Sequence, residues 1–219
     1  MPRALFTKTG NAVWMSHLDL MRLFQRAFKR AGLNLKHTQG FNPRPSVSIA
    51  LPMSVGVESV CELLDFDLEG QTVSCEEIRD RLNMALVDGV AVRQVYDDGA
   101  KIKHLTYLDC TLILDYDQGV PTDAAEKIHS LFTSGPVIVE KRSKNGTTQQ
   151  DIAPMIRTML LESRDANSLT LSVRICCQNP TLNPAQLPAA IALYLPEYMP
   201  DHVFYRRIEI YDAENSIFR

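Results

Sequence analysis

The chain begins with a hydrophobic pattern that predicts a short strand pair followed by one amphipathic helix. Residues 3–8 and 11–15 have the composition of strands, with Gly10 in the turn between them. Ser16 and Asp19 have the spacing of a capping box, which marks the start of the helix. Its apolar face is expected to consist of residues at helical spacing, namely Leu20, Phe24, Ala27, Phe28 and Ala31.

The rest of the first half continues this alternation. The apolar stretches 47–50 and 61–68 predict two strands, and residues 90–96 predict another. Between them, Ser74 and Glu77 repeat the capping pattern at the start of a second helix. The order strand–helix–strand–strand–helix–strand is that of a ferredoxin-like sandwich, to which the opening strand pair is an addition.

The second half repeats this order. Strands are expected at 107–116, 137–142, 168–176 and 203–211, and helices at 122–132, 151–162 and 184–194. Asp151 and Pro154 fit the start of the middle helix, as N-cap and first-turn proline. Asn145-Gly146 signals a hairpin turn before it.

A turn-forming stretch, Asp97-Asp98-Gly99-Ala100, lies between the two halves. It divides the 219 residues into an expected N-terminal domain, 1–98, and a C-terminal domain, 99–219, each of ordinary domain size. The predicted fold class is therefore α+β, with two ferredoxin-like α/β sandwich units and mainly antiparallel sheets.

Charge is distributed unevenly between these parts. Residues 1–60 hold eight Lys and Arg against two Asp and Glu, a net charge of +6. Because the whole chain has a net charge of −3, residues 61–219 carry −9. A basic segment in an acidic chain indicates an anionic partner for one face of the N-terminal half.

Other features exclude several classes of protein. The five cysteines form no C-x-x-C pair, so we expect buried thiols, with no metal or cofactor. No apolar run reaches the roughly 18–20 residues that span a bilayer, and the start lacks a secretory signal, so we expect a cytoplasmic protein without membrane contact. Phosphate-binding glycine loops and common hydrolase motifs do not occur.

The first predicted helix carries a basic arc, formed by Arg22, Arg26, Lys29 and Arg30. Such an arc is often only a solvated face, but this one has a single acidic residue, Asp19, to balance it. Further basic residues lie close in sequence, at Lys8, Lys36, His37 and Arg44. Because Lys and Arg contacts to phosphates supply much of the affinity for nucleic acids, the arc is a candidate RNA-binding surface.

His17 and Asp19, at the head of this helix, permit two interpretations. They are candidates for general acid or base, although residues two apart on a helix do not face each other. Alternatively, Asp19 completes the capping box and His17 only occupies the first turn.

A second polar segment, Gln39-Gly40-Phe41-Asn42-Pro43-Arg44-Pro45, is a loop by composition. Gly40 permits positive φ, while the two prolines restrict the backbone around Asn42 and Arg44. The loop would therefore present polar groups in fixed directions, at Gln39, Asn42 and Arg44. Phe41 would be either a stacking platform or the buried anchor of an ordinary sharp turn.

These segments fall into motifs shared with a known family. The motifs are Leu5-Phe6-Thr7-Lys8-x-Gly10, Ser16-His17-Leu18-Asp19-Leu20-Met21-Arg22, Arg26-x-x-x-Arg30-Ala31, Gln39–Pro45, Leu51-Pro52-x-x-x-Gly56 and Asp151-Ile152-Ala153-Pro154. Together they resemble the bacterial "radical SAM-linked" domain family of unknown function. Thr38 stands where that family usually has Ser.

The resemblance implies a partner. Members of that family are fused to, or encoded beside, radical S-adenosylmethionine proteins, near ribonuclease E/G-type and ribosomal protein genes. The chain itself has no C-x-x-x-C-x-x-C motif for an iron–sulfur cluster. The resemblance therefore implies an accessory or substrate-presenting protein for a radical enzyme, with RNA as the indicated substrate.

We expect a non-catalytic, RNA- or substrate-binding protein. Phosphates would be contacted by Lys8, Arg22, Arg26, Lys29 and Arg44, and the bound group would be oriented by His17, Asp19, Gln39, Phe41 and Asn42. One alternative is an enzyme that acts on an RNA base or a small anion, with His17 or Asp19 as acid or base. The other is an adaptor that binds the radical enzyme through an apolar surface.

Overall fold

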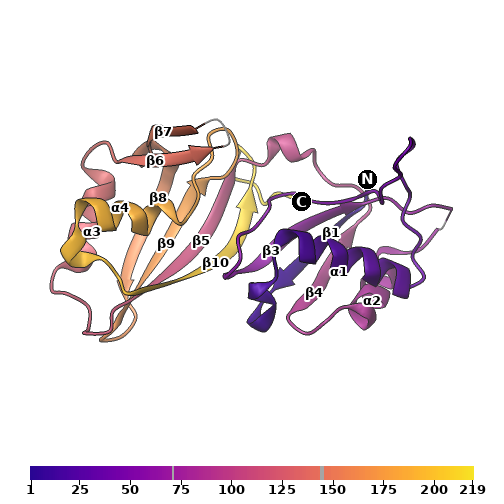
Figure 1. The fold of residues 1–219 in the computed structure, drawn as a ribbon, viewed down its shortest axis with the longest axis horizontal. Coiled ribbons are helices and arrows are strands. Elements are labelled where there is room, and N and C mark those ends of the chain that lie inside the picture. The colour runs from indigo at the N-terminus through magenta and orange to yellow at the C-terminus, as the bar shows by residue number, and fades with distance from the viewer. Residues whose placement is uncertain (71, 144–145) are drawn as a thin grey trace. The chain divides into compact units, whose positions relative to one another are not determined.

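The computed structural model describes residues 1–70, 72–143 and 146–219 (Figure 1). The chain divides into two compact units: Met1–His104 together with Ile217–Arg219, and Leu105–Ser216. The division lies a few residues beyond the turn-forming stretch at 97–100, and it assigns the last three residues to the first unit.

The first unit contains a four-stranded antiparallel sheet. Its strands are β1 (Arg3–Lys8), β2 (Val47–Ile49), β3 (Val57–Phe66) and β4 (Val90–Tyr96). The strands lie in the order β4-β1-β3-β2, and each neighbouring pair is antiparallel. This order, with one helix after β1 and one after β3, confirms the predicted ferredoxin-like arrangement.

Two helices, α1 (His17–Arg30) and α2 (Cys75–Ala85), cover the sheet of the first unit (Figure 1). The predicted apolar face of α1 is buried, and Phe24 packs edge-on against Phe6 of β1 with ring centroids 4.8 Å apart. Phe28, one turn later, packs against Phe66 of β3 at 4.9 Å. These aromatic contacts fix the rotation of α1, so that its basic arc faces away from the sheet.

The expected strand at 11–15 is wrong. This segment is the 3₁₀ helix η1 (Gly10–Trp14), which Gly10 enters with a φ of +54°. The physical reason is that β1 already pairs with β3 on one edge and β4 on the other. No hydrogen-bonding edge of β1 remains for a hairpin partner, so the chain turns directly toward α1.

A buried ion pair in the first unit joins β1 to β3, and the last residues of the chain pack beside it. The Arg3 guanidinium donates through Nε and Nη2 to the two carboxylate oxygens of Asp65, at 2.6 and 3.0 Å. Phe218 lies against it, with the ring centroid 5.3 Å from Cζ, and Ala100 N donates to Arg219 O at 2.8 Å. A Cβ on Gly99 would lie 2.6 Å from that Cζ, so a larger residue there would displace the guanidinium. The short 3₁₀ helix η2 (Ile102–His104) ends this part of the chain.

The second unit repeats the same sheet order with different strands. They are β5 (Tyr107–Asp115), β8 (Ile156–Ser163), β9 (Ser168–Cys176) and β10 (His202–Tyr211). They lie in the order β10-β5-β9-β8 and are all antiparallel to their neighbours. Both units therefore have one sheet topology, as the fold-class prediction requires.

Helices and a hairpin complete the second unit. The helices are α3 (Ala124–Thr133) and α4 (Gln186–Tyr194), with a 3₁₀ turn, η4 (Pro196–Tyr198), after α4. An antiparallel hairpin of β6 (Ile138–Ser143) and β7 (Gly146–Asp151) is inserted between α3 and β8. Asn145 of the predicted hairpin turn lies outside the described residues.

The expected helix at 151–162 is also wrong. Asp151 does act as a local cap, because its Oδ1 accepts from Ala153 N at 3.1 Å and from Val137 N at 2.9 Å. It opens only one 3₁₀ turn, η3 (Ala153–Met155), before the chain enters β8. Pairing of β8 with the edge of β9 overrides the local helical signal, since helix propensity is a weak preference.

All five cysteines are free thiols, and four of them are buried as expected. Cys75 is the exception, because it is half-buried and donates to Asp97 Oδ1 at 3.0 Å. Burial, with the neighbouring Asp97, raises the pKa of Cys75 to about 11, and burial raises the pKa of Cys110 to about 12. Within the described part of the chain, no helix has both the length and the apolar character needed to cross a membrane.

Candidate functional site

The capping box at the start of α1 is formed in full. Ser16 Oγ accepts from Asp19 N at 3.2 Å, and Asp19 Oδ2 accepts from Ser16 N at 3.4 Å and from Ser16 Oγ at 2.6 Å. The hydrogen bond from the Ser16 hydroxyl is the main cause that lowers the pKa of Asp19 below its ordinary value. Asp19 is therefore an ionised capping residue, which makes it a weak general base.

His17 lies beside this cap without bonding to it. Its Nδ1 is buried and has no hydrogen-bond partner in the described residues, while the side chain as a whole is half-buried. His17 and Asp19 therefore form no acid–base dyad, and a catalytic role at this helix end would depend on His17 alone.

The Leu51–Gly56 motif packs close to this end of α1. Gly56 N donates to Val13 O of η1 at 2.8 Å, and the Trp14 side chain lies 3.7 Å from the position of a Cβ on Gly56. Two large apolar side chains are exposed here, since Trp14 is 70 % and Leu18 is 63 % exposed. Two of the sequence motifs therefore meet around an apolar surface at the N-terminal end of α1.

The outer face of α1 carries the predicted basic arc, and all four of its side chains are exposed. Arg22 Nη1 lies 3.7 Å from Asp19 Oδ1, and Arg30 Nη2 donates to Ala85 O of α2 at 2.6 Å. Arg26 and Lys29 form no ion pair with any residue that the structure describes. Their charge is thus available to an anion from solution.

Lys8 lies apart from this arc. It is in β1, the central strand, and its side chain is fully buried. The structure therefore removes Lys8 from the exposed basic surface to which its position in the sequence assigned it. Lys8 belongs to the strand between β3 and β4 and not to the exposed face of α1.

The segment Lys36–Ser46 forms a closed loop with an exposed tip. His37 pairs with Pro45, Thr38 N donates to Arg44 O at 2.9 Å, and Arg44 N donates to the Thr38 hydroxyl at 3.0 Å. Thr38 thus supplies the hydroxyl that Ser would supply at the same place. The tip residues are all exposed, namely Gln39, Gly40, Phe41, Asn42, Pro43 and Arg44.

Phe41 is the most exposed large apolar side chain of the loop tip, with its whole surface open to solvent. It is therefore not the buried anchor of a sharp turn. The hydrogen bonds at the base of the loop restrict the backbone of the tip, so the exposed ring is held in a defined position.

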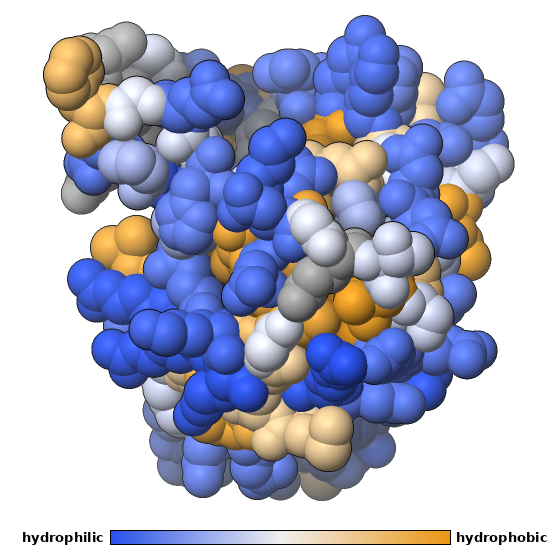
Figure 2. All heavy atoms as spheres, turned by 90° about the vertical axis from the view of Figure 1, so that its right-hand side faces the viewer, coloured by the Kyte–Doolittle hydropathy of each residue, from blue (hydrophilic) through white to orange (hydrophobic). Residues whose placement is uncertain are grey.

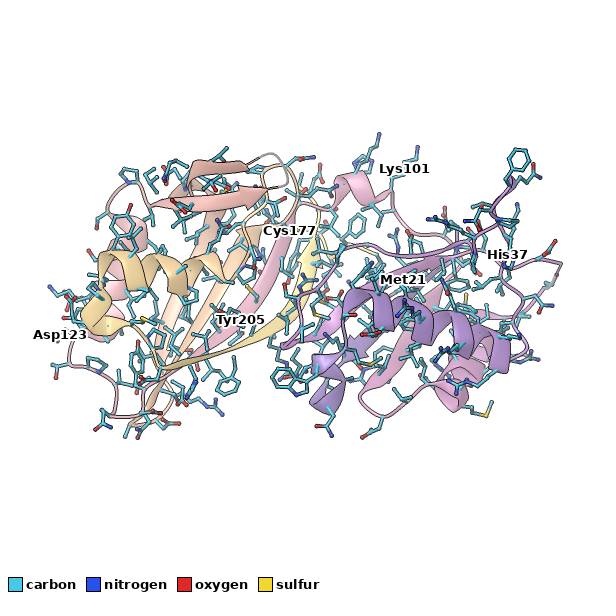
Figure 3. All side chains as sticks on the ribbon, in the orientation of Figure 1. Met21, His37, Lys101, Asp123, Cys177 and Tyr205 are labelled. Carbon is cyan, nitrogen blue, oxygen red and sulfur yellow. The ribbon has the colours of Figure 1, made fainter. Side chains whose placement is uncertain are left out.

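The structure separates the two groups of predicted site residues. Figure 3 labels Met21 in the first half of α1 and His37 near the other end of the helix. His17 and Lys29 are about 18 Å apart along the axis, at 1.5 Å per residue. The loop Lys36–Ser46 lies next to Lys29. Its polar residues therefore do not converge with His17 and Asp19. These residues are Gln39, Asn42 and Arg44.

A pocket that the sequence did not indicate lies at the loop end of α1. It has a volume of about 470 Å³, with a polar rim of Gln25, Lys29, Asn34, His37 and Glu69. We call it the α1 pocket. Glu69 reaches it because Lys36 N donates to Asp67 O and Glu69 N donates to Asn34 O, both at 2.9 Å. Such long-range backbone pairing leaves no local signal in the sequence.

The surface at this end of the first unit is largely hydrophilic, with smaller apolar areas between the polar side chains (Figure 2). A second pocket, of about 520 Å³, lies between the helices and includes Arg30, Arg81 and Met84. In the described residues, no three His, Cys, Asp or Glu side chains gather in a way that suits a metal ion.

A family model described as "Uncharacterized protein conserved in bacteria (DUF2344)" matches residues 2–184. The chain belongs to this family. The matched residues include every motif on which the sequence resemblance rests, so membership of an uncharacterized bacterial family is confirmed. The association with a radical S-adenosylmethionine enzyme stays a proposal. A search of the curated proteins gives no match.

Comparison with solved structures gives matches at low sequence identity. A chain in the crystal structure of a Cbf5–Nop10–Gar1 complex has a TM-score of 0.51 and 11 % identity, over 95 % of this chain and 48 % of that one. A chain in an H/ACA RNP bound to a substrate RNA containing 2′-deoxyuridine has a TM-score of 0.49 and 9 % identity, over 94 % and 46 %. The present chain thus spans about half the length of these structures, and the likeness concerns the fold alone.

Replacing Ser16 with Ala tests the capping assignment. We expect the free energy of unfolding to fall by about 1 kcal/mol and the pKa of Asp19 to rise toward its ordinary value, because the hydroxyl bond to its carboxylate is lost. Urea denaturation and an NMR titration of the Asp19 carboxyl measure the two effects.

The contribution of Asp19 to the stability of the folded chain depends on pH in one direction. The pKa of Asp19 is lower in the folded than in the unfolded chain, so its contribution is present above the unfolded-state pKa and is lost as the pH falls through the folded-state pKa. The difference in the free energy of unfolding between wild type and Ser16→Ala should therefore become smaller at acidic pH. Ser54→Ala, in an exposed loop, is the control. An unchanged Asp19 titration in Ser16→Ala would contradict the assignment.

Proposed function

We propose that the chain is a cytoplasmic, non-catalytic RNA-binding partner of a radical S-adenosylmethionine enzyme. The observation that carries the RNA part is a set of exposed basic side chains on α1 and the adjoining loop, namely Arg22, Arg26, Lys29, Lys36 and Arg44. In the described residues, only Arg22 among these has an ion-pair partner, Asp19 at 3.7 Å. Positive charge without internal partners is what phosphate binding requires.

The spacing of this surface suits an extended polyanion. The arc residues follow the helix axis over about two turns, and the loop continues the surface past the C-terminal end of α1. A single small anion would instead be held by converging donors in one enclosed place. The surface therefore favours a strand of RNA over a small substrate.

The exposed ring of Phe41 adds a contact of a different kind. Aromatic side chains displayed beside basic groups bind single-stranded nucleic acids, because any unpaired base can stack on them. A base within a duplex is already stacked and cannot do so. The combination of Phe41 and the basic arc thus favours RNA that contains unpaired nucleotides.

The partner enzyme is supported by the family resemblance and by the composition of the chain. These 219 residues lack the cysteine motif that would bind an iron–sulfur cluster, so radical chemistry would require residues outside them. The exposed apolar pair Trp14 and Leu18 lies at the end of α1 away from the loop and is our candidate contact for that protein. RNA and the enzyme would then bind to different parts of the same unit.

The triple variant Arg22/Arg26/Arg44→Ala tests the basic surface. We expect it to abolish tight binding to bulk bacterial tRNA and rRNA fragments at low salt. For any residual binding, the slope of log K against log salt concentration should be smaller in magnitude by about two. Each single-strand phosphate contact contributes about 0.7 to that slope, and the variant lacks three of them. Fluorescence anisotropy across a salt series measures both quantities.

The control removes the same charge elsewhere. Lys127, Arg164 and Arg206 are exposed in the second unit, so Lys127/Arg164/Arg206→Ala should leave binding nearly unchanged. Equal losses in the two triple variants would indicate a general effect of net charge and would contradict the assigned surface. Salt-independent binding by the wild type would count against phosphate contacts altogether.

Replacing Phe41 with Ala tests the stacking contact. We expect affinity for a short single-stranded RNA to fall roughly tenfold, with no change in stability because the ring is wholly exposed. Phe41→Tyr should retain the affinity. Phe204→Ala, at another exposed phenylalanine, is the matched control. The affinity for a duplex RNA of the same length should not change in any of these variants. If Phe41→Ala lowers the affinity for duplex and for single-stranded RNA equally, the stacking contact is refuted.

A protein adaptor is the second candidate function, and the exposure of Trp14 and Leu18 favours it. We expect Trp14/Leu18→Ala to abolish co-purification with the radical S-adenosylmethionine protein of the same bacterium, because apolar contacts supply most of the energy of such interfaces. Leu160→Ala, at another exposed leucine, is the control. Co-purification that survives the double substitution would exclude this contact. Loss of co-purification together with no RNA affinity in the wild type would establish the adaptor alone.

A further inference from the structure

The α1 pocket has the chemistry of a site for a planar, polar ring. Its apolar lining consists of Leu35 and Pro45, which are partly accessible, backed by Phe28 and Leu33, which are 0 % and 1 % exposed. Its volume of about 470 Å³ is within the range of roughly 300–1,000 Å³ that is usual for sites of organic ligands. An apolar floor contacts the faces of a ring, while a polar rim contacts its edge.

The pocket is held in shape before any ligand binds. Leu33 N donates to Phe28 O at 2.9 Å, and Leu35 pairs with Leu68 across the pocket wall. Phe28 is itself supported by Phe66, at 4.9 Å. A preformed site loses little conformational entropy on binding, which favours recognition of one ligand class over a nonspecific contact.

Glu69 is the unexpected member of the rim. It is the single acidic residue that lines the pocket, and it forms no ion pair with the residues that the structure describes. A carboxylate beside Lys29 and His37 weakens the attraction for phosphate, so phosphate binding alone does not account for it. An acceptor in this place suits a ligand that donates N–H groups.

We propose that the α1 pocket binds an unpaired nucleobase with an exocyclic amino group, and that Glu69 accepts a hydrogen bond from that group. This inference rests on the proposed RNA-binding function, and it specifies which bases of the RNA strand the protein binds. Carboxylates accept from the amino group of cytosine, whereas uracil presents a carbonyl oxygen at the same position and would be repelled. The pocket therefore prefers cytosine to uracil.

The neighbouring residues fit the rest of a nucleotide strand. Lys29 and His37 stand on the rim and are both exposed, so they can contact the phosphates on either side of the bound base. His37 also begins the loop that displays Phe41, where the next base along the strand can stack. The pocket and the loop thus form one continuous path for single-stranded RNA.

Oligocytidine and oligouridine of equal length provide the test, because both are flexible pyrimidine strands with the same charge. We expect the wild type to bind oligocytidine at least about fivefold more tightly at neutral pH. Glu69→Gln should abolish or reverse this preference, since the amide can donate to the uracil oxygen. Fluorescence anisotropy gives the ratio of the two affinities, in which the general effect of removing one negative charge cancels.

Glu162→Gln, at an exposed glutamate in β8, is the matched control and should keep the wild-type ratio. Equal affinity of the wild type for the two strands, or a ratio unchanged by Glu69→Gln, overturns the base pocket while leaving the basic surface intact. No binding of either strand at low salt overturns the proposed RNA-binding function and the pocket with it.

Discussion

The occupation of both edges of β1 is the constraint on which the first unit depends. With β3 on one side and β4 on the other, the chain that leaves β1 has no strand to join. It must turn through η1 and cross the sheet as α1, whose aromatic side chains then lock against β1 and β3. Because the apolar face of α1 packs on the sheet, its arginines are directed outward.

The sequence predicts those features that depend on neighbours along the chain. The cap formed by Ser16 and Asp19, the apolar face of α1 and the repeated order of strands and helices follow from local spacing, and the structure confirms them. The strand expected at 11–15 and the helix expected at 151–162 fail because strand pairing decides both. Local signals at Asp151 and Pro154 were real, but they govern a single turn.

The candidate site is predicted in part for the same reason. The exposure of Arg26 and Lys29 follows from the helical pattern, whereas Glu69 enters the pocket through backbone pairing with a segment more than thirty residues earlier. The sequence also suggested that all the polar motifs form one site. The length of α1 separates them, so that one end is apolar at Trp14 and the other is basic at Lys29.

The position of the last three residues makes the first unit discontinuous in sequence. Phe218 covers the Arg3 guanidinium, which is already enclosed by Asp65 and by the backbone at Gly99. The second unit is thus an insertion in the first, between His104 and Ile217. A fragment that stops at His104 would lack Phe218 and would therefore uncover one side of the buried arginine. The two units are therefore not consecutive in sequence, because the second is inserted within the first.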